Sequence, residues 1–450
     1  MLSLFWPQRA KGEERLHDHI LVFIPAYEGC ALYDPGLAKE DDDAPCVWGS
    51  LDAIRRQDLY FGLRMPNKLV ARTMLKAGPM DIYGRFVEQM TRRQPRQRAF
   101  FPYQRDKDFF LFAYDWRQDI GTVTAPALQY KLEEYARTYS LAGGGATGVP
   151  PKFVFITHSM GGLVVRTMLS QSPRLAERVE RLFLIGTPNL GSVKAIQTLL
   201  VGPGGLRENP VDFPASLLRW LPSDVDPLAT KLVAITRPSL YELLPLRDPN
   251  WTRIDAEGHS IRVSLDDMLT IGTWKHYWPS AAAEKAKFLD PWFARFAKGP
   301  DEPVEPKKWE FCQDGNYVEL QNILALVREW RLQLGTLGYT DKLLTRPGQP
   351  SRLRLLASRG ERTPTGIISE GEGDATKTRF LFEGDGDGTV TFESAVEDLD
   401  DSRVMVVKDV PHGKLMVHPI VTDYLVDELA ELVPPPALRP TAPDTRATIP

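Results

Sequence analysis

Ser159 stands between an apolar run and a helical pattern, at a place where a serine can act as a nucleophile. Residues 153–156 read Phe-Val-Phe-Ile, and residues 163–169 read Leu-Val-Val-Arg-Thr-Met-Leu. A sharp turn from a buried strand into a helix lifts the serine hydroxyl clear of the sheet. The helix start also brings backbone N–H groups and a positive dipole end near a developing oxyanion. The pattern therefore predicts acyl-transfer chemistry at Ser159.

The turn around Ser159 departs at one position from the G-x-S-x-G nucleophile elbow of α/β-hydrolases. Gly161 satisfies the second glycine of that pattern, but Thr157 stands where the first glycine is usual. The turn must therefore tolerate a β-branched residue. A plainer alternative is a strand, a turn and a helix in which the serine serves only as a cap.

A serine nucleophile needs a histidine base, and elimination among the seven histidines leaves two candidates. In α/β-hydrolases the order along the chain is serine, acid, histidine. Three histidines precede Ser159 and two lie in a predicted insertion: His17, His19, His158, His259 and His276. His412 follows an apolar run at 404–407, where open α/β sheets place their sites, and is favoured. His418, at the start of the last helical pattern, is the alternative.

The acid is expected one strand before the histidine, in the run Gly-Asp-Gly-Asp-Gly-Thr-Val at 384–390. We favour Asp387, because the following Gly-Thr-Val can fold its carboxylate back toward the histidine, and keep Asp385 as the second candidate. The alternating Asp-Gly run also resembles a calcium loop. It lacks a bidentate glutamate at the required spacing, so no metal is predicted there.

The oxyanion hole needs two N–H donors. One is predicted to be the backbone N–H of Met160, the residue after the nucleophile. The other is expected from the loop after an early apolar run at 19–25, where Tyr27 is the favoured donor.

Apolar runs alternate with helical patterns along most of the chain, which predicts an α/β fold: a mostly parallel central sheet with helices on both faces. The predicted core comprises residues 18–189 and 346–432, after an N-terminal segment at 1–17. Residues 190–345 are rich in Pro and Trp and poor in strand signals. They are predicted to form a large, mainly helical cap, in which Trp220 is a candidate substrate contact. The Pro-rich tail at 433–450 is predicted to be disordered.

Composition excludes several classes of protein. A net charge of −4 over 450 residues, with no Lys/Arg cluster, argues against a nucleic-acid partner. There is no signal peptide and no apolar run of about 18 residues that could span a bilayer, so a cytoplasmic location is expected. Cys30 and Cys46 are expected to be thiols, since three cysteines form no dense framework. No cofactor is predicted.

Several motifs together resemble the lecithin:cholesterol acyltransferase-like branch of α/β-hydrolases, which includes lysosomal phospholipase A2 and phospholipid:diacylglycerol acyltransferases. The most specific match is Tyr114-Asp115-Trp116-Arg117. The other matches are the early strand and loop (Val22 to Gly29, with Leu32), Val47-Trp48-Gly49-Ser50, the elbow at 158–162, the cap segment at 238–245, the acid motif at 386–390 and His412. Relatives in eukaryotes are secreted or membrane-anchored and have a disulfide-closed lid, and neither feature is evident in this sequence.

The resemblance implies a triad of Ser159, Asp387 and His412, with the Tyr27 and Met160 N–H groups as oxyanion donors. It also implies hydrolysis or transfer of acyl groups from phospholipid or acylglycerol esters through an acyl-enzyme. Asp115, Trp116 and Arg117 are expected to support the site through a carboxylate–guanidinium pair rather than by contact with substrate. Two alternatives remain open: a serine esterase for non-lipid esters, and a non-catalytic lipid- or protein-binding relative.

Overall fold

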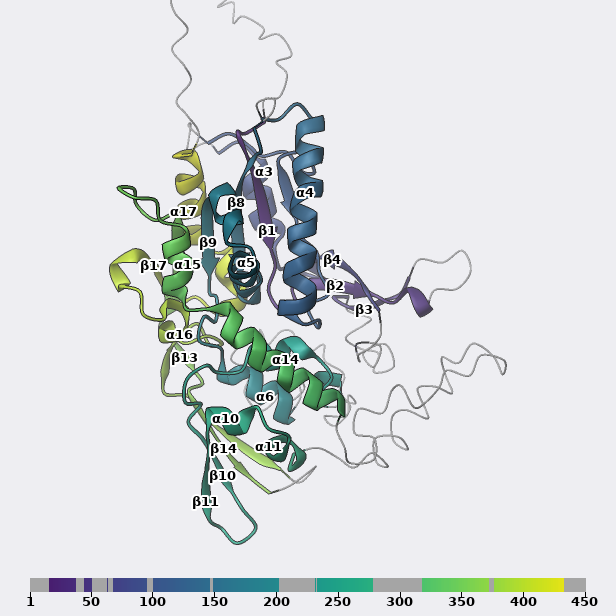
Figure 1. Cartoon of the computed structure of the whole chain (residues 1–450), viewed down its shortest axis with the longest axis vertical. Coiled ribbons are helices and arrows are strands. Elements are labelled where there is room, and N and C mark those ends of the chain that lie inside the picture. Colours follow the sequence, from purple (N-terminus) through teal and green to yellow (C-terminus); the bar gives the residue numbers. More distant parts are fainter. Residues whose placement is uncertain are drawn as a thin grey trace, which may run out of the picture.

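A six-stranded parallel sheet forms the centre of the molecule (Figure 1). The computed structural model describes residues 16–37, 44–50, 63, 68–94, 100–145, 149–201, 231, 233–277, 318–371 and 376–432. The strand order is β17-β12-β9-β8-β1-β7. These strands are β1 (His19–Ile24), β7 (Phe109–Leu111), β8 (Lys152–His158), β9 (Val179–Ile185), β12 (Leu353–Arg359) and β17 (Val404–Lys408). The predicted parallel α/β core is thus confirmed.

The strands are largely apolar because both faces of the sheet are covered, although β9 and β12 also contain charged residues. In β1, alternate residues enter two different cores. Ile20, Val22 and Ile24 belong to one apolar cluster, whereas Leu21 and Phe23 belong to the other. The sheet therefore separates two hydrophobic layers, each sealed by its own helices.

Two helices, α4 (Ala125–Leu141) and α5 (Met160–Gln171), pack against each other on one face of the sheet. The other face is covered by α3 (Gly84–Thr91) and the C-terminal helix α17 (Pro419–Ala430), which also contact each other. Every residue of α5 from Met160 to Leu169 is buried. A helix buried all round is placed rigidly, so the residue before it is held in a defined position.

The segment between β9 and β12 forms much of the lower half of the molecule in Figure 1. Its described helices are α6 (Val193–Val201), α9 (Pro238–Glu242), α10 (Leu265–Met268), α11 (Ile271–Lys275), α14 (Val318–Leu334) and α15 (Leu337–Leu343). It also contributes a hairpin of β10 (Trp251–Ile254) and β11 (Ser260–Val263), which the sequence did not suggest. That hairpin joins β14 (Gly366–Glu370) and β15 (Lys377–Leu381), from beyond residue 346, in a four-stranded sheet.

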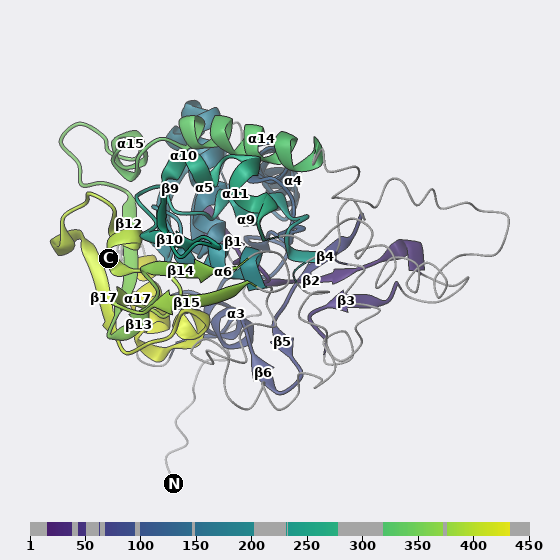
Figure 2. The ribbon, with the colours of Figure 1, turned by 90° about the horizontal axis from the view of Figure 1, so that it is seen from below.

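Three smaller sheets surround the ends of the central strands, and Figure 2 shows two of them from below. They are formed by β2 (Cys30–Tyr33), β3 (Cys46–Trp48) and β4 (Val70–Thr73); by β5 (Lys76–Ala77) and β6 (Met80–Asp81); and by β13 (Glu361–Thr363) and β16 (Gly384–Gly386). The remaining elements are α16 (Phe392–Val396), the π-helical turn η2 (Ile120–Thr124) and the 3₁₀ turns η1 (Pro35–Leu37), η3 (Pro173–Arg178), η9 (Asp401–Arg403) and η10 (His412–Val417).

The order of the strands reverses at β1, which has β7 on one side and β8 on the other. In open α/β sheets, ligands bind at such a switch point, beyond the carboxyl ends of the strands. The carboxyl ends of β1 and β8 lead directly into Pro25 and Ser159. The topology therefore predicts a ligand site at the loops that follow these two strands.

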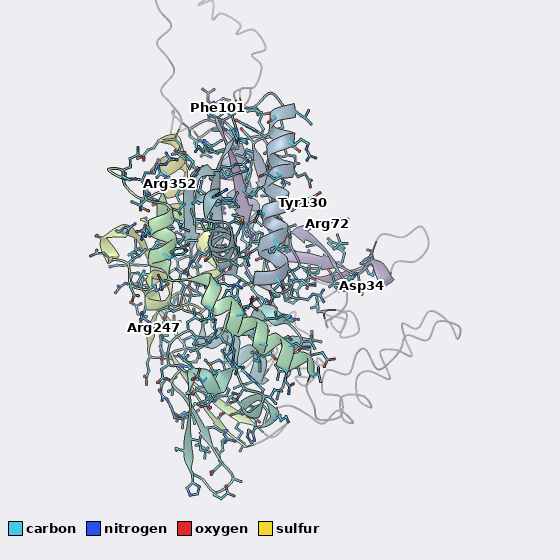
Figure 3. All side chains as sticks on the ribbon, viewed as in Figure 1. Asp34, Arg72, Phe101, Tyr130, Arg247 and Arg352 are labelled. Carbon is cyan, nitrogen blue, oxygen red and sulfur yellow. The ribbon has the colours of Figure 1, made fainter. Side chains whose placement is uncertain are left out.

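Two arginines labelled in Figure 3 tie outer segments to the core. Arg352 donates to the carbonyl oxygens of Ala176 and Leu344, both at 2.9 Å, where the chain returns into the sheet. Arg247 pairs with Glu393 at 2.6 Å and with Asp398 at 2.7 Å, which joins the segment after α9 to the neighbourhood of α16.

Three further sequence expectations concern the whole chain. Within the described ranges, no helix has the length and hydrophobicity needed to cross a membrane. Cys30 and Cys46 are free thiols, as expected. The tail at 433–450 and nearly all of the segment at 1–17 lie outside the described residues, so the expectation of disorder stays a prediction.

Candidate active site

Ser159 occupies a strained turn between β8 and α5. Its backbone dihedral angles are φ 54° and ψ −125°, a region that non-glycine residues rarely enter. The turn is held because the Ser159 N–H donates to the carbonyl of Ile185 at 2.9 Å and the Gly162 N–H donates to the carbonyl of Ser159, also at 2.9 Å. This is the geometry expected of a nucleophile elbow.

The two glycines after Met160 allow close packing of the elbow. A Cβ atom on Gly161 would lie 2.4 Å from the carbonyl oxygen of Ile24, and one on Gly162 would lie 2.1 Å from Oγ1 of Thr187. Both distances are shorter than any real Cβ contact, so neither position accepts a side chain without displacing its neighbour. Gly161 thus lets the start of α5 approach the end of β1, and Gly162 lets it approach Thr187, just after β9.

Thr157, the departure from the usual elbow pattern, is explained by its place inside the sheet. It pairs with Ile24 on one side and Leu184 on the other, and its side chain is completely buried. Its hydroxyl donates to the carbonyl oxygen of Phe183 at 2.8 Å. A β-branched residue suits a central strand, and the hydrogen bond satisfies the hydroxyl that burial would otherwise penalise.

Asp387 and His412, the favoured acid and histidine, lie side by side. Nδ1 of His412 donates to Oδ2 of Asp387 at 2.7 Å, and the His412 N–H donates to the Asp387 carbonyl at 2.9 Å. The other carboxylate oxygen accepts from the backbone N–H groups of Thr389 at 3.0 Å and Val390 at 2.7 Å. The carboxylate is therefore fixed, and it in turn fixes the orientation of the His412 imidazole through Nδ1.

The two alternative candidates, Asp385 and His418, lie in different surroundings. Asp385 is half exposed, accepts from the Gly360 N–H at 2.6 Å and lies 3.7 Å from Arg359. His418 is the residue before α17, and its side chain makes no capping hydrogen bond there. Because Asp385 and Asp387 serve different partners, the Asp-Gly run does not gather its carboxylates around one point.

Ser159 and His412 both line one cavity of about 530 Å³. Tyr27, the predicted oxyanion donor, lines the same cavity, and its loop is a tight turn in which the Gly29 N–H donates to the Ala26 carbonyl at 2.9 Å. The Ala26 N–H is engaged by Tyr83 Oη at 3.1 Å. Met160 is the first residue of α5, at the positive end of the helix dipole. The assignment of Tyr27 and Met160 as oxyanion donors stays a prediction.

The walls of the cavity are mostly apolar. One wall comes from the short β5–β6 hairpin and its flanks, through Met74, Ala77, Met80 and Ile82. The opposite wall comes from α6 and the α9 region, through Ala195, Leu240 and Leu243. An apolar cavity of this size beside Ser159 suits a long hydrocarbon chain.

The Tyr-Asp-Trp-Arg motif supports the loop that contains Tyr27. None of the four residues of the motif lines the cavity. Arg117 forms a two-point pair with Asp115, at 2.8 Å and 2.5 Å. Trp116 donates to the carbonyl of Cys30 at 2.9 Å, and Tyr114 donates to the carbonyl of Pro25 at 2.7 Å. The motif thus bonds to the backbone on both sides of this loop, and its supporting role at the site stays a prediction.

Glu28, in the same loop, is the one acidic residue among the described residues that line the cavity. Its φ of 61° is in the left-handed region. Burial raises the pKa of the Glu28 carboxyl from its usual value near 4.5 to about 7, although the nearby Arg237 opposes the shift. Arg237 Nη1 lies 3.5 Å from the Glu28 carboxylate and donates to Tyr27 Oη at 2.7 Å. A residue next to α9 thus reaches the predicted oxyanion loop.

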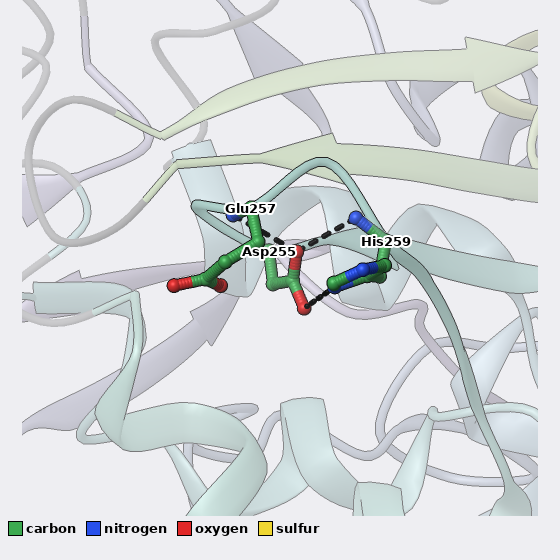
Figure 4. Close-up of side chains that lie close together, drawn as sticks. All are labelled: Asp255, Glu257 and His259. Carbon is green, nitrogen blue, oxygen red and sulfur yellow. Dashed lines mark hydrogen bonds and ion pairs between the residues drawn. The ribbon is translucent and has the colours of Figure 1, made fainter.

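Trp220, the predicted substrate contact in the cap, lies outside the described residues. Among the residues that are described, Asp255, Glu257 and His259 form a group whose ligand atoms lie within 4.8 Å of one another (Figure 4). They sit at the exposed turn between β10 and β11, where Asp255 accepts from the His259 N–H at 2.7 Å. These contacts close the hairpin, which does not line the cavity.

Sequence reasoning missed Tyr83, His158, Glu28 and Arg237. His158 was set aside because it precedes the nucleophile, yet its side chain contacts the backbone of His412. Tyr83 sits in a part of the chain without a recognised motif. The sequence signal that could have pointed to Glu28 and His158 is that each is the immediate neighbour of a predicted site residue, Tyr27 and Ser159 respectively.

Comparison with known proteins confirms the predicted resemblance for part of the chain. Residues 96–206 match the model of the lecithin:cholesterol acyltransferase family. This segment contains both the Tyr-Asp-Trp-Arg motif and the elbow with Ser159. No curated protein sequence matches the chain.

The solved structures that match this chain are distant in sequence. The Tle4–Tli4 complex contains a chain 12% identical, with a TM-score of 0.56, and the match covers 92% of this chain and 98% of that one. Two others are the Bacillus licheniformis lipase BlEst2 (10% identity, TM-score 0.33, 92% and 91% covered) and phospholipase PlaB from Legionella pneumophila (14%, 0.24, 56% and 46%). The central sheet has the α/β-hydrolase fold, and residues 96–206 relate the chain to the lecithin:cholesterol acyltransferase family.

Proposed function

We propose that the protein is a serine enzyme that cleaves fatty-acyl esters of lipids through an acyl-enzyme, and that it passes the acyl group mainly to water. The observation that carries the proposal is the meeting of three features at one place. A strained serine and a carboxylate-held imidazole both line a single, mostly apolar cavity. The match of residues 96–206 to an acyltransferase family supports the same chemistry.

In the first half of the reaction, Ser159 Oγ attacks the ester carbonyl carbon while its proton passes to Nε2 of His412. Asp387 stabilises the imidazolium that forms. The carbonyl oxygen becomes an oxyanion, for which the Tyr27 and Met160 N–H groups are the proposed donors, each contributing about 3 kcal/mol. The carbon–oxygen bond to the alcohol then breaks, and His412 returns its proton to that alcohol.

In the second half, water attacks the acyl-enzyme and gives a proton to His412, and the fatty acid leaves as Ser159 recovers its hydroxyl. An acceptor alcohol in place of water yields a new ester instead. The balance between hydrolysis and transfer depends on how well the covered cavity excludes water.

Two measurements test the proposal. A fluorophosphonate probe should label the wild-type protein and the Ser170→Ala control, which removes a serine of the same helix that does not line the cavity, but not Ser159→Ala. Mass spectrometry should detect fatty acid released from a panel of phospholipids and acylglycerols, and new esters when an alcohol is added. Labelling of Ser159→Ala would refute the nucleophile. Turnover confined to short, water-soluble esters would point to a non-lipid esterase.

A further inference from the structure

Tyr83 and His158 form a buried chain of hydrogen bonds beside the triad. Tyr83 stands between β6 and α3 and is 2% exposed, and His158 is the last residue of β8 and is 4% exposed. Tyr83 Oη accepts from the Ala26 N–H at 3.1 Å and lies 3.0 Å from Nδ1 of His158. Nε2 of His158 in turn lies 3.1 Å from the carbonyl oxygen of His412.

The direction of these hydrogen bonds follows from the groups at the two ends. The Ala26 N–H can only donate, and the His412 carbonyl can only accept. The Tyr83 oxygen therefore accepts from Ala26 and turns its own proton toward Nδ1 of His158. His158 must then carry its proton on Nε2, so every group is satisfied when this imidazole is neutral. Burial, and next to it the neighbouring His412, hold the pKa of His158 well below its usual value, which agrees with a neutral ring.

This series of hydrogen bonds ends, on each side, at a main-chain atom of a separate part of the proposed site. At one end is the loop that carries Tyr27, and at the other is the backbone of His412. A Cβ atom on Gly29 would lie only 2.7 Å from Tyr83 Oη, so this loop packs directly on the hydroxyl. The rings of His158 and His412 are also close, with centroids 4.9 Å apart.

We infer that Tyr83 and His158 are positioning residues, which set the distance between the oxyanion loop and the catalytic histidine by hydrogen-bonding to both. This inference rests on the proposed function. Oxyanion donors act only within about 2.7–3.1 Å of the oxygen, and a displacement of about 1 Å can cost about 100-fold in rate. Loss of either side chain should therefore lower kcat while leaving KM nearly unchanged.

The first test compares Tyr83→Phe with Tyr103→Phe. Tyr103 is also 2% exposed, and its hydroxyl lies 2.6 Å from Nε2 of a second buried histidine, His19, in a cluster that does not line the cavity. Both variants lose one buried tyrosine–histidine hydrogen bond. We expect Tyr83→Phe to lower kcat by roughly 10- to 100-fold and Tyr103→Phe by less than about twofold, at similar thermal stability. Equal kcat values in the two variants would overturn the inference.

The second test uses two amides at position 158. In His158→Gln the amide N–H can reach the place of Nε2 and donate to the His412 carbonyl. In His158→Asn the shorter amide takes the place of Nδ1, next to Tyr83, and does not reach His412. We expect Asn to lose as much kcat as Tyr83→Phe, and Gln, which keeps the hydrogen bond to the His412 carbonyl but not the one to Tyr83, to lose less than Asn. The double variant Tyr83→Phe/His158→Asn should be no slower than the slower single variant, because each substitution interrupts the same series of hydrogen bonds. Equal losses for Gln and Asn would contradict the inference.

A third measurement keeps the inference testable if a variant does not fold. Nitrogen-15 NMR of histidine-labelled wild-type protein should show His158 as the neutral ring with its proton on Nε2, unchanged down to about pH 5, well below the usual histidine pKa. A proton on Nδ1 would overturn the proposed direction of the chain. If the wild type turned over no ester while the NMR result held, the proposed function would fail and the hydrogen-bond chain would stand.

Discussion

Oδ2 of Asp387 lies 2.7 Å from Nδ1 of His412, while the side chain of Asp385, two residues earlier, turns to the backbone of Gly360. The difference arises at the end of β16. The chain turns sharply at Asp387, whose own carboxylate accepts from the N–H groups of Thr389 and Val390. This local turn aims one aspartate at the histidine and leaves the other in solvent.

Exchange of the two aspartates for asparagine should separate their roles. Asp387→Asn keeps the shape of the side chain but favours the wrong tautomer of the His412 imidazole. A loss in kcat of about 10³- to 10⁴-fold is therefore expected, as in other serine triads. Asp385→Asn should change kcat by less than about twofold, since its carboxylate touches only Gly360 and Arg359. Steady-state kinetics on one soluble ester measures both, and a large loss in Asp385→Asn alone would reassign the acid.

The strained backbone of Ser159 predicts that a glycine at this position gives a more stable fold than an alanine, although both variants lack the hydroxyl. A non-glycine residue at φ 54° and ψ −125° carries strain of about 1–3 kcal/mol. Ser159→Gly removes the Cβ atom, and Ser159→Ala keeps it. Allowing for the greater flexibility of unfolded glycine, Ser159→Gly should exceed Ser159→Ala in free energy of unfolding by about 1 kcal/mol. Urea denaturation of both inactive variants measures the difference, and a less stable glycine variant would show that the turn is unstrained.

The apolar wall at Ala77 predicts a change in chain-length selectivity. Ala77→Phe places a ring into the cavity, whereas Lys76→Phe places the same ring on the outer side of the hairpin, where Lys76 is exposed. For p-nitrophenyl esters, kcat/KM for long acyl chains should fall at least about 10-fold in Ala77→Phe, while short chains stay within about twofold. The Lys76→Phe profile should match the wild type. A uniform loss at all lengths would exclude this wall as the acyl site.

The raised pKa of Glu28 predicts a pH dependence of stability. Because the folded protein binds this proton more tightly than the unfolded chain does, protonation stabilises the fold. That stabilisation is complete below about pH 4.5 and is lost as the pH rises to about 7. The wild type should therefore lose stability between pH 5 and pH 7.5 relative to Glu28→Gln, which cannot ionise. Thermal unfolding of both proteins across this range measures the difference, and parallel curves would mean that the Glu28 pKa is ordinary.

Much of the core could be predicted because its signals are local. Parallel strands buried on both faces must be largely apolar, and the six strands of the central sheet all coincide with apolar runs of the sequence or overlap them. The elbow was recognisable because a strand, a serine, two glycines and a helix follow one another directly. The β10–β11 hairpin was missed because its partners, β14 and β15, lie about a hundred residues further along the chain, and short strands are stabilised mainly by such pairing.

The sequence by itself determined which residue types are present for the chemistry and in what order: a serine at an elbow, two aspartates in a glycine-rich loop and two late histidines. Tertiary structure alone decided which aspartate meets which histidine, because that depends on the direction of side chains across turns. It also decided how Thr157 fits inside the sheet and brought His158 to His412, 254 positions further along the chain. Contacts of this kind depend on the packing of distant segments, and no local pattern in the sequence encodes them.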